Sequence, residues 1–529
     1  MKFRFCTGIV GIAALACACT SGNVKESANP GPITAGKHTQ VETTYGTIEG
    51  YLDDDLYTFK GIQYAKAERF MPPQKPDHFD GVRMAKIYGP KAMQGQTFDY
   101  SYKPTDYAFG NNFVMEPMSE TECLVLNVWT KGINDGKKRP VFVWIHGGGY
   151  STGSGHDLPC YDQGNLARKG DIVGISINHR LNVLGFTDLT ALGGKYSESV
   201  NLGVQDMVKA LEWIHDNIEK FGGDPDCVTI AGQSGGGGKI GTLMGTPSAK
   251  GLFHRAIIQS GMNTTAIGDG EASKQFGLAF AQELGVKPGP DADFSKFTYQ
   301  ELVDASRRAS SKGIRAGQGP VRDGKILPYH PFGEDGLPLH DNVPLIIGTN
   351  FNEFTFDISN TLTEEEAEAQ LAQRIGAENV PAFVEQFKKV YPGWGPEAML
   401  YMDTMFRIGT LDMAEAKSAR GKADTYLFQF MWKPENNVLG ASHGMELPFM
   451  SNNIALQREM TGSSESAYAL ADVMSNYWLA FIKTGDPNVK GQVAWEPYDA
   501  EKGACMMLDN ECKVLYHHDR PLMEALRRR

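Results

Sequence analysis

The sequence lacks a run of apolar residues long enough to cross a membrane as a mature helix, a span that takes about 20 residues. Its most apolar stretch, residues 8–18, is shorter and follows the basic residues Lys2 and Arg4. That order is typical of a secretory signal. We therefore expect residues 1–18 to be a leader and the protein to be exported.

Of the eight cysteines, Cys6 and Cys17 lie in the leader and Cys19 directly follows it, and Cys17 and Cys19 bear on its processing. Small residues around Cys17 predict cleavage before Cys19. Either of these cysteines could instead carry a bacterial lipid, although the leucine usual three residues earlier is absent. We expect a periplasmic protein, a secreted protein or a membrane-anchored lipoprotein, with that lipid as its only contact with a membrane.

Metal-ligand spacings of cysteine and histidine are missing as well. No cysteine and histidine pattern matches a zinc site, and H-E-x-x-H does not occur, so we expect no metal. No organic cofactor is implied either. Five cysteines follow residue 19, and this odd number leaves at least one thiol unpaired. Cys505 and Cys512 flank a predicted hairpin turn at residues 509–510, and either a disulfide or two buried thiols would fit.

Positive charge is scarce. The chain has 51 Lys and Arg against 63 Asp and Glu, a net charge of −12, and no basic stripe apart from residues 527–529. This balance argues against a nucleic-acid partner, because such binding depends on basic side chains that neutralise phosphates. No internal repeat, low-complexity linker or composition break divides residues 19–529, so we expect one domain. The sequence gives no indication of the oligomeric state.

Apolar runs that predict buried strands alternate with helical patterns through the first half of the chain. Residues 204–221 have apolar positions at helical spacing and end at the breaker Gly222-Gly223-Asp224-Pro225. This alternation predicts an α/β fold with a central, mostly parallel, twisted sheet and helices on both faces. The predicted strands are residues 123–130, 141–147, 172–178, 227–232, 256–261 and 343–350.

Two later segments, roughly residues 271–318 and 361–422, are charged and helical in pattern. We expect them to be helical insertions between sheet elements that cover an active-site cleft. For residues 364–375, EEEAEAQLAQRI, a solvated surface helix without a functional role is the favoured interpretation.

The stretch AGQSGGGGKI resembles two different functional turns. A phosphate loop needs glycine where Gln233 stands and Ser or Thr where Ile240 follows Lys239, so its register fails. Residues 232–236 instead fit G-x-S-x-G, the strained strand-to-helix turn that exposes a nucleophilic serine. The candidate nucleophile is therefore Ser234.

A serine hydroxyl needs a histidine to accept its proton and an acid to orient that histidine. On folds built around this turn the partners follow in the order Ser, acid, His. Of six histidines after Ser234, His443 lies in a loop of small residues, ASHGMELP. Glu353 directly follows the last predicted strand and is the preferred acid, with Asp357 and Asp323 as the alternatives.

Acyl transfer also needs donors for the developing oxyanion. The segment His146-Gly147-Gly148-Gly149-Tyr150 follows an apolar strand and offers backbone N–H groups without side chains, the HGGG pattern expected opposite a nucleophilic serine. The two motifs together predict a serine hydrolase.

The chain resembles the type B carboxylesterases, which include the cholinesterases and the bacterial para-nitrobenzyl esterases. The resemblance runs from Gly46 to about Trp495. It rests on ECLVLNVW (122–129), WIHGGGY (144–150), NHRLNVLGF (178–186), NLGVQD (201–206), FGGDPDCVTIAGQSGGG (221–237), IIQSG (257–261), GTNFNE (348–353) and TGDPN (484–488).

The resemblance implies an α/β-hydrolase fold and assigns roles to matched positions. The nucleophile would be Ser234, the acid Glu353 and the base His443. The oxyanion would be held by the N–H groups of three residues, which are Gly148, Gly149 and Gly235.

Some positions depart from the family pattern. The family often has Glu before the nucleophile and Ala after it, where this chain has Gln233 and Gly235. Gly235 keeps the N–H group, so the oxyanion hole is expected to be complete. Many members pair the cysteine at 123 with an earlier cysteine, but residues 20–122 contain none, so we expect Cys123 to be a buried thiol.

We expect an enzyme that hydrolyses carboxylic esters of small molecules through an acyl-enzyme. The alternative is a catalytically inactive binding or adhesion module, as in the neuroligins, because fold alone does not fix function. Cholinesterases bind a cationic substrate through a tryptophan, which residues 106–122 lack, and Gln233 is uncharged. Tyr107, Phe109 or Phe113 would supply only a weaker aromatic face, so we expect neutral esters to be preferred over choline esters.

Overall fold

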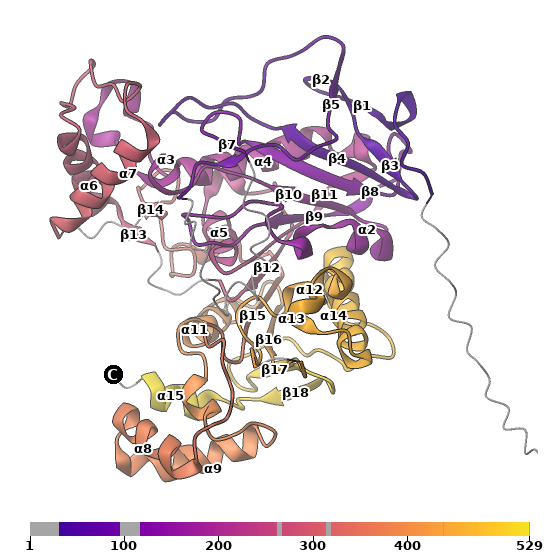
Figure 1. The fold of residues 1–529 in the computed structure, drawn as a ribbon, viewed down its shortest axis with the longest axis vertical. Coiled ribbons are helices and arrows are strands. Elements are labelled where there is room, and N and C mark those ends of the chain that lie inside the picture. Colours follow the sequence, from indigo (N-terminus) through magenta and orange to yellow (C-terminus); the bar gives the residue numbers. More distant parts are fainter. Residues whose placement is uncertain (1–30, 96–116, 262–266, 314–318, 437, 528–529) are drawn as a thin grey trace, which may run out of the picture.

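The computed structural model describes residues 31–95, 117–261, 267–313, 319–436 and 438–527. The predicted leader and residues 106–116 lie outside this part of the chain. An 11-stranded sheet forms its centre (Figure 1). In spatial order the strands are β18 (Lys513–Tyr516), β17 (Ala504–Leu508), β16 (Thr425–Phe430), β15 (Leu345–Asn350), β12 (Arg255–Gln259), β11 (Gly223–Gln233), β9 (Arg139–Ile145), β10 (Val173–Ile177), β8 (Val125–Thr130), β4 (Leu56–Gln63) and β3 (Tyr51–Asp53).

The sheet is parallel in its middle and antiparallel at its two ends. The strands from β17 to β10 run parallel to their neighbours, whereas β18, β8, β4 and β3 pair antiparallel. Strands β10 and β15 are buried at every residue, as expected for strands covered on both faces. All six predicted strands are confirmed, and so is the expected mostly parallel α/β sheet.

Helices cover the sheet and fill the connections between strands. α4 packs on α5 and β11, while α14 contacts α2, β9 and β11. The helices are α2 (Gly164–Gly170), α3 (Asn182–Phe186), α4 (Leu202–Asn217), α5 (Gly235–Met244), α6 (Gly270–Glu283), α7 (Tyr299–Ser311), α8 (Glu364–Ile375), α9 (Val380–Val390), α10 (Ala398–Tyr401), α11 (Arg407–Ser418), α12 (Leu447–Met450), α13 (Arg458–Thr461), α14 (Glu465–Thr484) and α15 (Arg520–Arg527).

Seven short strands form three small sheets beside the main one. These are β1 (Gln40–Thr43) with β2 (Gly46–Glu49) and β5 (Val82–Met84), β6 (Lys91–Ala92) with β7 (Met118–Ser119), and β13 (Gly268–Asp269) with β14 (Val321–Arg322).

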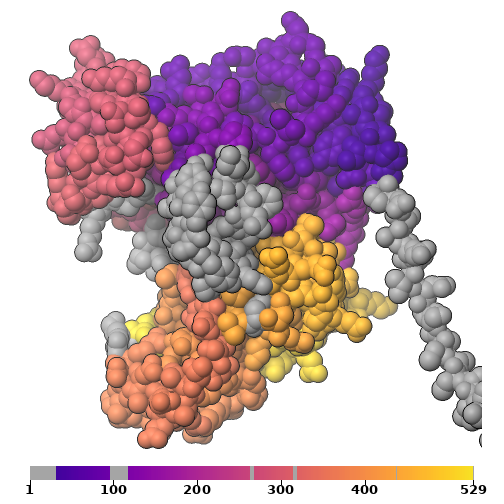
Figure 2. All heavy atoms as spheres, viewed as in Figure 1, coloured from indigo at the N-terminus to yellow at the C-terminus, as the bar shows by residue number. Residues whose placement is uncertain are grey.

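Both segments predicted as insertions contain helices. α6 and α7 pack against each other and form the pink lobe beside the N-terminal half in Figure 2. α8 and α9 lie at the opposite end of the molecule, where α8 also contacts α10 and α15 (Figure 1). Thr363 and Glu366 form a capping box at the start of α8. Within residues 361–422, it is the start of α11 that reaches the candidate site described below.

The glycines of α5 allow its backbone to touch the sheet directly. A Cβ on Gly236 would lie 2.2 Å from the Ile145 carbonyl oxygen, and one on Gly232 would lie 2.5 Å from the Gly236 carbonyl carbon. Neither position has room for a side chain. The turn from β11 into α5 is therefore pressed against the end of β9, where the residues 146–149 begin.

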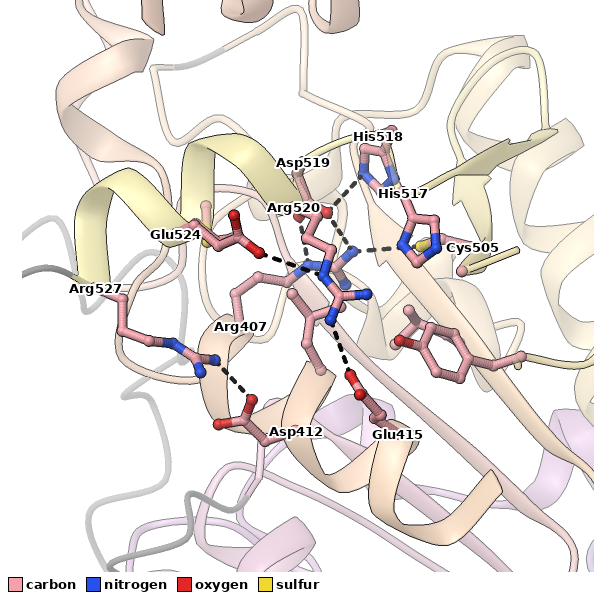
Figure 3. A pocket seen from close by; sticks show the side chains of 15 residues that line it. Arg407, Asp412, Glu415, Cys505, His517, His518, Asp519, Arg520, Glu524 and Arg527 are labelled. Carbon is pink, nitrogen blue, oxygen red and sulfur yellow. Dashed lines mark hydrogen bonds and ion pairs between the residues drawn. The ribbon is translucent and has the colours of Figure 1, made fainter. Parts of the chain in front are cut away.

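One buried ion pair and two exposed ones hold the C-terminal helix α15. Arg407 Nε lies 2.7 Å from an oxygen of Asp519, and both side chains are almost fully buried. Arg520 and Arg527 pair with Glu415 and Asp412 on α11. These groups line a pocket of about 60 Å³ shown in Figure 3, where the charged side chains face one another. The ion pairs that line this pocket attach α15 to α11.

The cysteines in the described part of the chain are all free. Cys123 is buried, which confirms the expected buried thiol. Cys505 lies on β17 and Cys512 just before β18, which pairs antiparallel with β17, so the predicted hairpin at residues 509–510 is confirmed. Among the helices of the described residues, none combines the length and apolar character that a membrane crossing requires.

Candidate active site

Ser234 occupies the turn between β11 and α5 in a strained conformation. Its φ of 57° and ψ of −128° fall in a region that residues other than glycine rarely adopt. The Ser234 N–H donates to the Gln259 carbonyl oxygen at 2.9 Å, and its own carbonyl accepts from the Gly238 N–H at 3.1 Å. These two bonds hold the strained turn between β12 and the first turn of α5.

The loops that follow β15 and β16 bring Glu353 and His443 together. The His443 N–H donates to the Glu353 carbonyl oxygen at 2.8 Å, so the two backbones pair at this point. The His443 Nδ1 lies 2.5 Å from Glu353 Oε2. Both side chains are almost fully buried. The imidazole is therefore oriented by the carboxylate, with Nδ1 toward Glu353 and Nε2 on the other side.

Donors converge on the Glu353 carboxylate. The Ser260 hydroxyl donates to Oε1 at 2.6 Å and the Asn350 N–H at 2.7 Å, while His443 contacts Oε2. Burial raises the pKa of Glu353 above its ordinary value, and the hydrogen bonds from Ser260 and Asn350 act in the opposite direction. Hydrogen bonds to both oxygens favour the ionised form that can stabilise an imidazolium.

His443 is kept neutral by burial. Burial lowers its pKa to about 4, and the nearby carboxyl groups of Glu446 and Asp403 oppose that shift. With Nδ1 donating to Glu353, the neutral ring carries an unprotonated Nε2. The Phe354 and Phe406 rings lie 4.2 Å and 5.5 Å from the imidazole, measured between centroids. An imidazole in this state can accept a proton at Nε2.

The nitrogen of the Gln233 side chain lies 3.2 Å from His443 Nε2. Gln233 directly precedes Ser234, so Nε2 lies beside the residue that leads into the strained turn. A glutamine amide at this position donates a hydrogen bond to the neutral ring, whereas a glutamate would add a negative charge beside it. The departure from the family pattern at Gln233 therefore changes the charge next to the imidazole.

The glycines of HGGG lie against the same turn. Gly148 and Gly149 have φ values of 76° and 62°, in the left-handed region. A Cβ on Gly235 would lie 2.3 Å from the Gly149 oxygen and 2.4 Å from its nitrogen, so the two backbones are in direct contact. Within the described part of the chain, the N–H groups of Gly148, Gly149 and Gly235 donate no hydrogen bond. Three unused N–H groups thus lie next to Ser234.

The structure separates the three candidate acids clearly. Glu353 contacts His443, Asp323 accepts hydrogen bonds from the N–H groups of Ile326 and Leu327 in its own turn, and Asp357 is exposed.

The contacts of Gln233, Ser260, Asn350 and Glu446 were not predicted individually. The signal for three of them lay in the motifs AGQSGGGG, IIQSG and GTNFNE, each of which contains one of these residues. Nothing in the sequence pointed to Phe406.

No metal-ligand cluster of three His, Cys, Asp or Glu side chains occurs among the described residues. The polar groups around Ser234 are instead an imidazole, a carboxylate and backbone N–H groups. This set can transfer protons and stabilise an anion.

Comparisons with known proteins identify relatives of the whole chain. The family model of the carboxylesterase family matches residues 37–522. Para-nitrobenzyl esterase of Bacillus subtilis is 32% identical over 90% of this chain and 96% of its own length. Phenmedipham hydrolase of Pseudarthrobacter oxydans is 32% identical over 89% and 94%. The structure of an esterase from anaerobic Clostridium hathewayi that can hydrolyse aliphatic aromatic polyesters matches with a TM-score of 0.85 and 33% identity, covering 94% of this chain and 99% of that one.

Proposed function

The chain belongs to the carboxylesterase family and is a carboxylic-ester hydrolase, and we propose that Ser234, His443 and Glu353 carry out its reaction through an acyl-enzyme. The expected resemblance, the α/β-hydrolase fold and the enzyme class are confirmed, so the inactive binding module is set aside. The observation that supports these three residues is the 2.5 Å contact between His443 Nδ1 and Glu353, which leaves Nε2 beside Gln233, the residue before Ser234.

In the proposed acylation, His443 Nε2 removes the proton of the Ser234 hydroxyl as Oγ attacks the ester carbonyl carbon. The N–H groups of Gly148, Gly149 and Gly235 hold the resulting oxyanion. The carboxylate of Glu353 stabilises the imidazolium, which then donates its proton to the departing alcohol.

In the proposed deacylation, His443 removes a proton from a water molecule that attacks the acyl carbon. The second tetrahedral intermediate uses the same oxyanion donors. Its collapse releases the carboxylic acid and returns the proton to Ser234, so the enzyme is regenerated. No step uses a metal or an organic cofactor.

We further propose that neutral esters of short to medium acyl chains are preferred over choline esters of the same acid. The uncharged Gln233 beside His443 supports this, as does the lack of tryptophan in residues 106–122, most of which lie outside the described residues. The names of the relatives are compatible with neutral esters. Measuring kcat/KM for a panel of nitrophenyl and natural esters determines the preferred acyl and alcohol groups.

Export is proposed from the leader alone. Residues 1–18, with Cys17 and Cys19 as cleavage or lipidation positions, lie outside the described residues. Intact-mass analysis of protein from the native host tests this proposal. An uncleaved cytoplasmic chain would refute it, and an added acyl mass on either cysteine would identify a lipoprotein.

Substitution of Ser234 tests the proposed reaction. Ser234→Ala should lower kcat by roughly 10⁶-fold and abolish labelling by a fluorophosphonate probe, because the attacking oxygen is lost. Ser199→Ala is the matched control, since Ser199 is also buried and lies in the segment before α4. Retention of more than a few per cent of activity by folded Ser234→Ala would contradict the assignment.

A further inference from the structure

Lys239 is the first residue after the four glycines of α5 and is fully buried. Its Nζ donates to the His146 carbonyl oxygen at 2.9 Å and to the Gly147 carbonyl oxygen at 3.3 Å. Both carbonyls belong to the HGGG segment. The lysine that resembles a phosphate-loop residue in the sequence therefore points back to the loop beside Ser234.

The second of these carbonyls shares a peptide group with a proposed oxyanion donor. The Gly147 C=O and the Gly148 N–H lie on opposite sides of one planar unit, so the direction of one fixes that of the other. The His146 Nδ1 lies 3.0 Å from the same Gly147 oxygen. Burial lowers the pKa of His146 well below its usual range, so the ring is neutral and Nδ1 must carry the proton to donate. Two donors thus hold one carbonyl.

We infer that Lys239 is a positioning residue of the oxyanion hole, whose side-chain amine orients and polarises the Gly147–Gly148 peptide so that the Gly148 N–H faces Ser234. This inference rests on the proposed function. A donor on the carbonyl side strengthens the N–H of the same peptide, because hydrogen bonds in a chain polarise one another. The benefit falls on the transition state, where the negative charge develops.

The surroundings of Lys239 support a role beyond filling space. Burial of an amine is costly unless its N–H groups are satisfied, and a methionine would fill the same volume without that cost. The Tyr150 ring lies 5.9 Å from Nζ and Asp157 is the nearby acid, while His146 and His179 are kept neutral. Burial lowers the pKa of Lys239 to about 7, and both forms of the amine donate hydrogen bonds.

A second buried lysine supplies a matched control. Lys417, on α11, donates to the carbonyl oxygens of His340 and Asp341 at 2.9 Å and 3.5 Å. It is 1% exposed, so it resembles Lys239 in burial and in its partners. It lies ten residues along α11 from Arg407, or about 15 Å. Lys417→Met therefore removes a comparable amine without touching the HGGG segment.

The experiment compares Lys239→Met with Lys417→Met in the full-length chain. We measure kcat and KM for a neutral nitrophenyl ester, the inhibition constant of a trifluoromethyl ketone that forms a tetrahedral adduct with Ser234, and the melting temperature. Lys239→Met should lower kcat by about tenfold or more, but by less than the 10²- to 10³-fold of a deleted donor. The ketone should lose affinity by the same factor, while KM changes less than about twofold. Lys417→Met should alter only the melting temperature.

Equal kcat and ketone affinity in Lys239→Met and Lys417→Met would overturn the inference, as would a change confined to KM. If Lys239→Met does not fold, Lys239→Gln carries the same test, since its shorter amide can donate to only one carbonyl and should give a smaller loss. Ser234→Ala is measured in parallel. Activity retained by Ser234→Ala refutes the proposed function, whereas its loss together with an unchanged Lys239→Met refutes the inference alone.

Discussion

The contact between Gly235 and Gly149 gives a sharp test of the proposed oxyanion hole. In the pattern of the family that this sequence resembles, alanine often follows the nucleophile, so Gly235→Ala looks conservative in sequence. In this structure the new Cβ would lie 2.3 Å from the Gly149 oxygen and 2.4 Å from its nitrogen and Cα, whereas real Cβ contacts essentially never fall below 3.0 Å. The obstacle is backbone, so the loop must move by about 0.7 Å to bring the 2.3 Å contact to at least 3.0 Å.

The size of the effect follows from that displacement. A misplacement of about 1 Å in a catalytic group can cost about 10²-fold in rate, so we expect kcat to fall by roughly 10- to 10²-fold. The KM should change little, because the oxyanion forms only in the transition state. Alanine in a helix usually gains up to about 1 kcal/mol over glycine, but overpacking costs about 1–3 kcal/mol. The free energy of unfolding should therefore fall by up to about 2 kcal/mol.

The assay measures kcat and KM for a neutral nitrophenyl ester together with urea unfolding. Gly393→Ala is the control, because nothing lies within 4 Å of its added Cβ and its φ is not in the left-handed region. That variant should keep the wild-type kcat. If folded Gly235→Ala also keeps the wild-type kcat, the Gly149 backbone does not need its present position, and the assignment of the oxyanion donors is wrong.

Glu353→Gln should lower kcat far more than it raises KM, because the carboxylate acts on the transition state through His443; a larger loss in Asp357→Asn would identify a different acid. Burial lowers the pKa of His443 below its ordinary value of 6.5, so the acidic limb of kcat/KM should lie below pH 6.5; an acidic limb at or above pH 6.5 would contradict the neutral, buried ring. Asp519→Asn should lower the free energy of unfolding by about 3–5 kcal/mol in urea titrations, because it leaves the buried Arg407 unpaired; an unchanged unfolding midpoint would refute that role of the pair. A neutral butyrate ester whose leaving group matches that of butyrylcholine in reactivity should give a higher kcat/KM than butyrylcholine, and the reverse order would refute the proposed preference.

The strands and the turn at Ser234 could be predicted from local sequence. Buried parallel strands are continuous apolar runs, so VFVWI and IVGISI identify β9 and β10 without knowledge of their neighbours. The G-x-S-x-G and HGGG motifs depend on backbone strain and on missing side chains, which are also local properties. The strands β4 and β16 were not predicted. Polar residues interrupt both apolar runs, Lys60 and Gln63 in β4 and Gln429 in β16, so neither is a continuous apolar run.

The sequence by itself determined the α/β class, the family and the candidate nucleophile, because each of these is written in short patterns. The tertiary structure decided which carboxylate meets His443. Glu353 and Asp357 are four residues apart, and only the pairing of the loops after β15 and β16 brings one of them to Nδ1. It also decided that the Lys239 side chain donates a hydrogen bond to the carbonyl oxygen of Gly147, which lies 92 residues away in the chain. Contacts of this kind depend on the register of a sheet, which local periodicity does not encode.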